Sequence, residues 1–173
     1  TEPSGRLPIT FPRHAGQLPV YYNQIRGQHG NRYADLTQNP AFAFGEGLSY
    51  TTFEYGDPTI TNVPESGAFG ETDTVHAEIT LTNTGDRKGT EVVQLYIGDI
   101  VTSYSWTDRE LQAFQRVKLE PGESKTVVFD IPVSDCTIVD SEANRIVEPG
   151  EFEVLIGHSS RREHLKRTTF TVA

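Results

Sequence analysis

The chain has 173 residues and a mass of 19.3 kDa, which suits one domain with an attached segment and excludes a complete large catalytic barrel. Hydrophobic residues make up 35% of the sequence, enough to fill the core of a folded domain. The formal net charge of -9 repels phosphate groups and anionic lipid headgroups, so neither a nucleic acid nor a membrane surface is expected as a partner.

The start of the sequence and its single cysteine indicate whether the chain is a piece of a longer protein and in which cellular compartment it works. The sequence contains no Met and starts with Thr1, so we interpret it as a piece of a longer polypeptide. It has no apolar stretch of the ~20 residues that a membrane span needs, and no signal peptide at its start. Cys136 is the only cysteine and excludes an internal disulfide; with the absence of Asn-x-Ser/Thr sites it favours a reducing compartment. The localisation stays open between the cytoplasm and secretion by a bacterium.

The first 54 residues differ from the rest. The net charge is +1 over residues 1–50 and -10 over residues 51–173. Residues 7–12 alternate like a strand but are bracketed by prolines, which is typical of an edge strand. Residues 13–54 show no periodicity and are rich in Gly, Pro and aromatic residues, which predicts an irregular connector draped over a surface.

From about residue 55 onward the sequence consists of short β-type runs. Residues 75–81 alternate between apolar and polar side chains, as in a strand with one buried face, and the same alternation follows at 93–97, 127–131, 152–156 and 170–172. Pro121-Gly122 and Pro149-Gly150 predict turns with a glycine at positive φ. Short strands at this spacing predict an all-β, immunoglobulin-like antiparallel sandwich, and the lack of a Cys…Trp…Cys arrangement favours its fibronectin type III-like form.

Several motifs, in order along the chain, carry a more specific resemblance. They are Ser4–Pro12, Gly16–Asn23, Phe44–Phe53, Thr82–Gly85, Gly89–Tyr96, Glu110–Phe114, Leu119–Glu123 and Pro149–Phe152. Together they closely resemble the C-terminal part of glycoside hydrolase family 3 enzymes of the β-glucosidase type, including their fibronectin type III-like domain. Two features depart from the family pattern: Glu46 replaces an aromatic residue or His, and the loop at residues 103–108 lacks the usual Arg-Pro.

The resemblance implies a domain organisation and a place for the chemistry. Residues 1–12 would be the last strand of a preceding α/β sandwich domain, residues 13–54 a connector, and residues 55–173 the fibronectin type III-like domain. The intact enzyme would release terminal β-glucosyl or similar residues with an Asp nucleophile and a Glu acid/base, both upstream of this chain. No catalytic residue is therefore assigned here, and the chain alone is expected to be inactive.

Exposed aromatic residues are the candidate site. Tyr104 and Trp106 lie two residues apart in a predicted loop, and Tyr21 and Tyr22 lie in the connector; such rings either stack on sugars or pack on a neighbouring domain, and we favour packing. The five histidines lack metal-ligand spacing, so we expect no metal and no cofactor.

The expected partners follow from this interpretation. They are the upstream catalytic domains, a β-glucan or oligosaccharide as a further candidate, and a second copy of the chain through residues 1–50, which would otherwise be mobile. An independent carbohydrate-binding module is the alternative function, and a general adhesion or protein-interaction module is the least supported.

Overall fold

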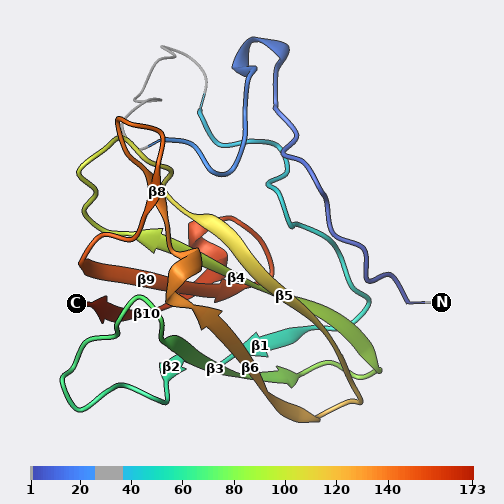
Figure 1. The fold of residues 1–173 in the computed structure, drawn as a ribbon. Coiled ribbons are helices and arrows are strands. Elements are labelled where there is room, and N and C mark those ends of the chain that lie inside the picture. The colour runs from blue at the N-terminus through green and yellow to red at the C-terminus, as the bar shows by residue number, and fades with distance from the viewer. Residues whose placement is uncertain (1, 26–36) are drawn as a thin grey trace.

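The computed structural model describes residues 2–25 and 37–173, and the fold is an antiparallel β-sandwich (Figure 1). Residues 2–25 and 37–52 lie across the sandwich, and from here on this whole segment is called the connector. One sheet contains β3 (Thr74–Asn83) between β6 (Ser124–Pro132) on one side and the short strands β1 (Phe53–Tyr55) and β2 (Thr59–Ile60) on the other. The second sheet has the order β10-β9-β4-β5, formed by Leu165–Val172, Gly150–Gly157, Gly89–Asp99 and Glu110–Leu119. The predicted all-β sandwich is confirmed.

Three short 3₁₀ turns and one small hairpin complete the described elements. The turns are Ala15–Gln17, Val133–Asp135 and Arg162–His164, and the hairpin pairs β7 (Ile138–Val139) with β8 (Arg145–Ile146). Within the described residues, no helix is long and apolar enough to span a membrane.

The core lies between the two sheets and uses the alternation that the sequence shows. On β3, Val75, Ala77, Ile79 and Leu81 are at most 1% exposed, and they face the buried side chains of the other sheet. Phe152, Phe69 and Phe170 pack as an aromatic group, with Phe152 and Phe170 stacked at 5.3 Å between ring centroids. Because successive side chains of a strand point to opposite faces, the polar partners on β3 and β6 face outward.

The outer face of the second sheet is covered. Nearly all residues of β4 are buried, including Val92, Gln94 and Tyr96, whose side chains point away from the core. Their cover is the connector, which Figure 1 shows in blue and cyan running along the sandwich. The molecule thus has a third, irregular layer over one sheet only.

The structure differs from the sequence prediction for residues 1–50, which were expected to be mobile or to bind another copy of the chain. The described part of this segment folds back onto its own sandwich instead. Residues 7–12 do not form a strand: Leu7 exchanges backbone hydrogen bonds with Gly45 and Glu46, and Phe11 forms an isolated bridge with Phe42. The physical reason is that the outer face of β4 is itself apolar and needs cover. Self-association stays a prediction.

Two local predictions were also incomplete. Gly122 has the expected positive φ of 73°, whereas Gly150 is the first residue of β9 and has no positive φ. Strand β5 has no simple period-2 pattern because its pairing with β4 shifts between Leu95 and Tyr96, so that Ala113 and Leu111 face opposite sides.

The folded-back connector predicts slow amide hydrogen exchange in a dilute monomer. The amides of Phe11 and Gly45 donate to backbone oxygens at 2.8 Å, and we expect both to exchange far more slowly than the amide of Leu48, whose residue is 86% exposed. Exchange of Phe11 and Gly45 at the rate of Leu48, measured by NMR, would show that the connector is detached.

Candidate functional site: the connector and its groove

A side-chain amide on β4 holds the connector to the sheet. The Gln94 amide nitrogen donates to the carbonyl oxygen of Gly45 at 3.0 Å and to that of His158 at 2.7 Å, and its oxygen accepts the Tyr96 hydroxyl at 2.5 Å. Gly45 has φ of +81°, and a Cβ built on it would lie 2.1 Å from the Gln94 oxygen. Only glycine fits this contact, because both the backbone conformation and the close approach exclude a side chain.

Tyr22 fastens a second part of the connector. Its ring stacks on Phe44 with 4.4 Å between centroids and meets the edge of Tyr96 at 5.7 Å. Its hydroxyl accepts the Leu111 amide at 3.1 Å, while burial raises the pKa of this phenol. Tyr22 is therefore a structural residue of the connector and is only partly accessible.

Two ion pairs join the connector to the sandwich. Arg6 pairs with Glu91 on β4, and both side chains are less than one-tenth exposed. Arg161, in the β9–β10 loop, pairs with Glu46, and its guanidinium also donates to the carbonyl oxygens of Pro40 (3.3 Å) and Ala41 (3.2 Å).

Glu46, the unusual carboxylate of the family motif, is thus bound within the fold. Burial opposes its charge, but hydrogen bonds from Arg161 and from the Ala43 amide (3.0 Å) outweigh burial and lower the pKa of Glu46. Through these contacts Glu46 joins the connector to the β9–β10 loop.

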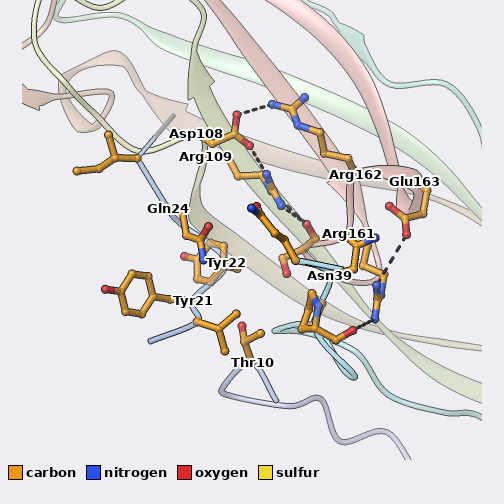
Figure 2. A pocket seen from close by; sticks show the side chains of 16 residues that line it. Thr10, Tyr21, Tyr22, Gln24, Asn39, Asp108, Arg109, Arg161, Arg162 and Glu163 are labelled. Carbon is orange, nitrogen blue, oxygen red and sulfur yellow. Dashed lines mark hydrogen bonds and ion pairs between the residues drawn. The ribbon is translucent and has the colours of Figure 1, made fainter. Parts of the chain in front are cut away.

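A groove of about 570 Å³ lies between the connector and this loop (Figure 2). Tyr21 and Gln24 belong to one connector segment, which is joined to the sandwich by the Asp108 amide donating to the Gln24 carbonyl oxygen at 2.9 Å. Figure 2 shows the three arginines Arg109, Arg161 and Arg162 along the side opposite Tyr21.

The predicted aromatic residues fall in separate places. Tyr21 is 51% exposed and lines the groove, and Tyr22 lines it from a half-buried position. Trp106 is half-buried in a narrow crevice beside Ile97 and Cys136, and Tyr104 is 38% exposed. The four residues therefore do not form one site.

The described residues contain no group of His, Cys, Asp and Glu side chains that could hold a metal. Cys136 is buried, which raises the pKa of its thiol to about 12. His158 is half-buried and stacks on His164, with 4.3 Å between ring centroids, and its partial burial lowers its pKa to about 4.

The structural roles of Gln94 and Arg161 were not predicted from the sequence. Gln94 is the one amide side chain within the otherwise apolar stretch of β4 at residues 92–97. A polar side chain at such a position must find hydrogen-bond partners when it is buried, and this pattern could have indicated its role. The sequence did not identify a partner for Arg161, and the structure shows that it pairs with Glu46.

The ion pair between Glu46 and Arg161 predicts a pH-dependent loss of stability. Because folding lowers its pKa, Glu46 stabilises the fold above its unfolded-state pKa of about 4.3, and this contribution is lost as the pH falls through the folded-state value. Glu46→Gln should therefore lower the free energy of unfolding by about 1–3 kcal/mol at pH 7, and the difference from the unmodified chain should shrink below pH ~4.

Glu54→Gln, at an exposed carboxylate of β1, is the control and should change stability little at either pH. Urea unfolding at several pH values measures both variants. A Glu46→Gln effect of equal size at pH 7 and pH 3 would contradict the assigned charge interaction.

Comparison with known proteins agrees with this architecture. Residues 91–160 match the fibronectin type III-like domain family. A solved β-glucosidase involved in saponin metabolism from intestinal bacteria is 82% identical with a TM-score of 0.97, and the match covers 100% of this chain and 23% of that one.

Two curated relatives extend the comparison. A β-xylosidase of Formosa agariphila is 40% identical over 98% of this chain and 23% of its own length, and a periplasmic β-glucosidase of Salmonella typhimurium is 39% identical over 92% and 22%. The chain thus spans less than a quarter of the length of these relatives. It belongs to glycoside hydrolase family 3, as a C-terminal part that includes the fibronectin type III-like domain.

Proposed function

We propose that this chain braces the catalytic domains of a glycoside hydrolase that releases terminal β-glucosyl or related β-glycosyl residues. The observation that carries the proposal is the concentration of exposed apolar side chains on the connector. Of the twelve large hydrophobic residues that are exposed in the described part of the chain, seven lie between residues 9 and 50. They are Ile9, Phe11, Leu18, Tyr21, Phe42, Leu48 and Tyr50, of which Tyr21 lines the groove and is not assigned to the docking surface that we propose.

Phe11 and Phe42 form the centre of the proposed docking surface. Their rings meet edge to face with 6.4 Å between centroids, and they remain 42% and 58% exposed, next to Ile9 at 57%. A cluster of apolar side chains on a surface is typical of a contact with another protein surface. The upstream domains of the same polypeptide are the occupant that we propose.

The opposite outer face of the sandwich has a different chemistry. The outward residues of β3 and β6 are mainly polar or charged, such as Glu78, Thr80 and Asp130. This face suits water, whereas the connector face suits a dry contact. The difference supports docking through the connector, with the exposed Tyr104 as a further contact residue and the half-buried Trp106 supporting its loop.

The substrate class comes from the relatives and is part of the proposal. The solved protein at 82% identity is a β-glucosidase involved in saponin metabolism, and the curated relatives are a β-xylosidase and a β-glucosidase. We therefore propose a β-glycoside as the substrate of the whole polypeptide.

The chain alone should not hydrolyse aryl β-glucosides or aryl β-xylosides. A retaining mechanism needs two carboxyl groups free to act on the sugar, whereas the three least exposed glutamates in ion pairs, Glu91, Glu153 and Glu46, are all bound to arginines. Release of nitrophenol above the buffer rate by the purified chain would contradict this expectation.

The docking surface is tested by the double substitution of Phe11 and Phe42 to Ser. In the longer polypeptide we expect the melting temperature to fall by several degrees, because burial of each ring is worth ~1.5–3 kcal/mol. In the 173-residue chain alone the same change should have a much smaller effect, because both rings are exposed there.

The control is the double substitution of Val63 and Val101 to Ser, at exposed positions outside the connector. It should lower the melting temperature of the longer protein less than the Phe11 and Phe42 double substitution does. Equal effects of the Phe11 and Phe42 change in the chain and in the longer protein would reject the docking surface.

A further inference from the structure

The groove beside the connector differs in chemistry from the docking surface. Ile9 and Phe11 are exposed, whereas Thr10, between them, lines the groove together with Gln24, Gln38 and Asn39. The groove volume of about 570 Å³ lies within the range of small-molecule sites, roughly 300–1,000 Å³. Its lining combines hydrogen-bonding side chains with apolar ones such as Val20 and Ile25, and it has one well-exposed aromatic ring, that of Tyr21.

The charges of the groove favour a neutral ligand. Arg162 pairs with Asp108 at 2.8 Å, Arg109 also pairs with Asp108, and Arg161 pairs with Glu46. Arg161 also pairs with Glu163 at 3.9 Å and Arg162 with Glu153 at 3.5 Å, so each of the three guanidinium groups has at least one carboxylate partner. A phosphate or carboxylate ligand would have to break these pairs, whereas a polyhydroxylated neutral molecule would not.

The same ion pairs make the groove rigid. Arg109 also donates to the Ser160 carbonyl oxygen, at 3.1 Å from Nε and 2.5 Å from Nη2, which ties the loop before β5 to the loop after β9. Arg162 reaches Glu153 on β9 at 3.5 Å. A wall held in this way loses little conformational entropy when a ligand binds, which favours affinity.

One hydroxyl in the groove lacks a protein partner. The Thr10 Oγ1 atom is buried and makes no hydrogen bond to the described residues. A buried polar atom without a partner costs free energy, and a rotation of the Thr10 side chain toward the groove, which it lines, would let this hydroxyl bond to a ligand and remove that cost. Thr10 is thus a second observation, independent of the groove's shape, that indicates a hydrogen-bonding ligand.

We propose that this groove binds a neutral oligosaccharide with β-linked glucosyl or xylosyl units, at a site separate from the docking surface. The apolar face of one sugar ring packs on the exposed Tyr21 ring, and its hydroxyls bond to Thr10 and to the amide side chains of Gln24 and Asn39. The choice of a β-linked sugar rests on the proposed function, whereas the choice of a neutral polyol rests on the groove itself.

The test is a titration of the ¹⁵N-labelled 173-residue chain with cellobiose and with xylobiose, followed by NMR. We expect saturable shift changes at the amides of Tyr21, Gln24 and Arg161, and none that saturate with glycerol, which lacks a ring. Tyr21→Ala should weaken binding by about tenfold through loss of stacking and burial, whereas Tyr21→Phe should bind within about twofold of the unmodified chain.

Two further variants separate binding from folding. Tyr50→Ala removes a ring that is 67% exposed and does not line the groove, so it should bind like the unmodified chain. Thr10→Val removes the unpartnered hydroxyl at nearly constant volume and should weaken binding several-fold without lowering the melting temperature. A purely structural role for Thr10 would not give that combination.

Three results would overturn the proposal: no saturable shifts with either disaccharide, equal binding by Tyr21→Ala, or equal shifts with glycerol. Binding by the chain but not by the longer polypeptide would assign the groove to the upstream domains and would also overturn it. Failure of the docking surface is seen separately, in the melting temperatures of the Phe11 and Phe42 variants, so the two proposals fail independently.

Discussion

The arrangement depends on burial of the outer face of β4 beneath the connector. Most sandwich strands bury one face, but β4 buries both, with Leu95 toward the core and Tyr96 toward the connector. An apolar outer face without cover would expose Val92 and Tyr96 to water, at a cost of roughly 25 cal/mol per Å² of apolar surface. The Gln94 amide then gives the cover a unique position, because its partners Gly45 and His158 come from two different segments.

The two ion pairs lie close to the Gln94 contact, because the Leu7 amide, next to Arg6, donates to the Glu46 carbonyl oxygen at 2.9 Å. Glu91 is buried, and burial raises its pKa despite the opposing effect of Arg6. Such a carboxylate is costly without its arginine, because an unpaired buried charge destabilises a fold by several kcal/mol. Arg6 therefore belongs to the fold as much as any core residue does, although it lies only a few residues from the N-terminus.

The two sides of the connector form two different surfaces, one apolar and outward-facing and one that lines the groove. Its outward side carries Phe11 and Phe42, which suit a dry contact with protein, and its inward side leaves a polar groove whose charges are already paired. The first surface accounts for the proposed brace, since apolar rings contribute most when another surface removes them from water. The second offers hydrogen bonds in a rigid frame, which is the chemistry that a neutral sugar needs.

The sequence by itself determined the class of fold. The alternation of apolar and polar side chains identified the strands β3, β6 and β9. The turn at Pro121-Gly122 was predicted because proline fixes φ and glycine permits a positive φ. These features are local, so short stretches of sequence are enough to recognise them. The family motifs likewise indicated a C-terminal part of a glycoside hydrolase, which the relatives confirm.

Only the tertiary structure decided where the connector lies and what its residues do. Glu46 and Arg161 are 115 positions apart, and Arg6 and Glu91 are 85 apart, so no local pattern could pair them. The connector has no periodicity because its position is set by individual contacts with the sheet. Periodicity reports a regular backbone packed on one surface, whereas an irregular segment is placed by the shape and the unpaired polar groups of the surface that it covers.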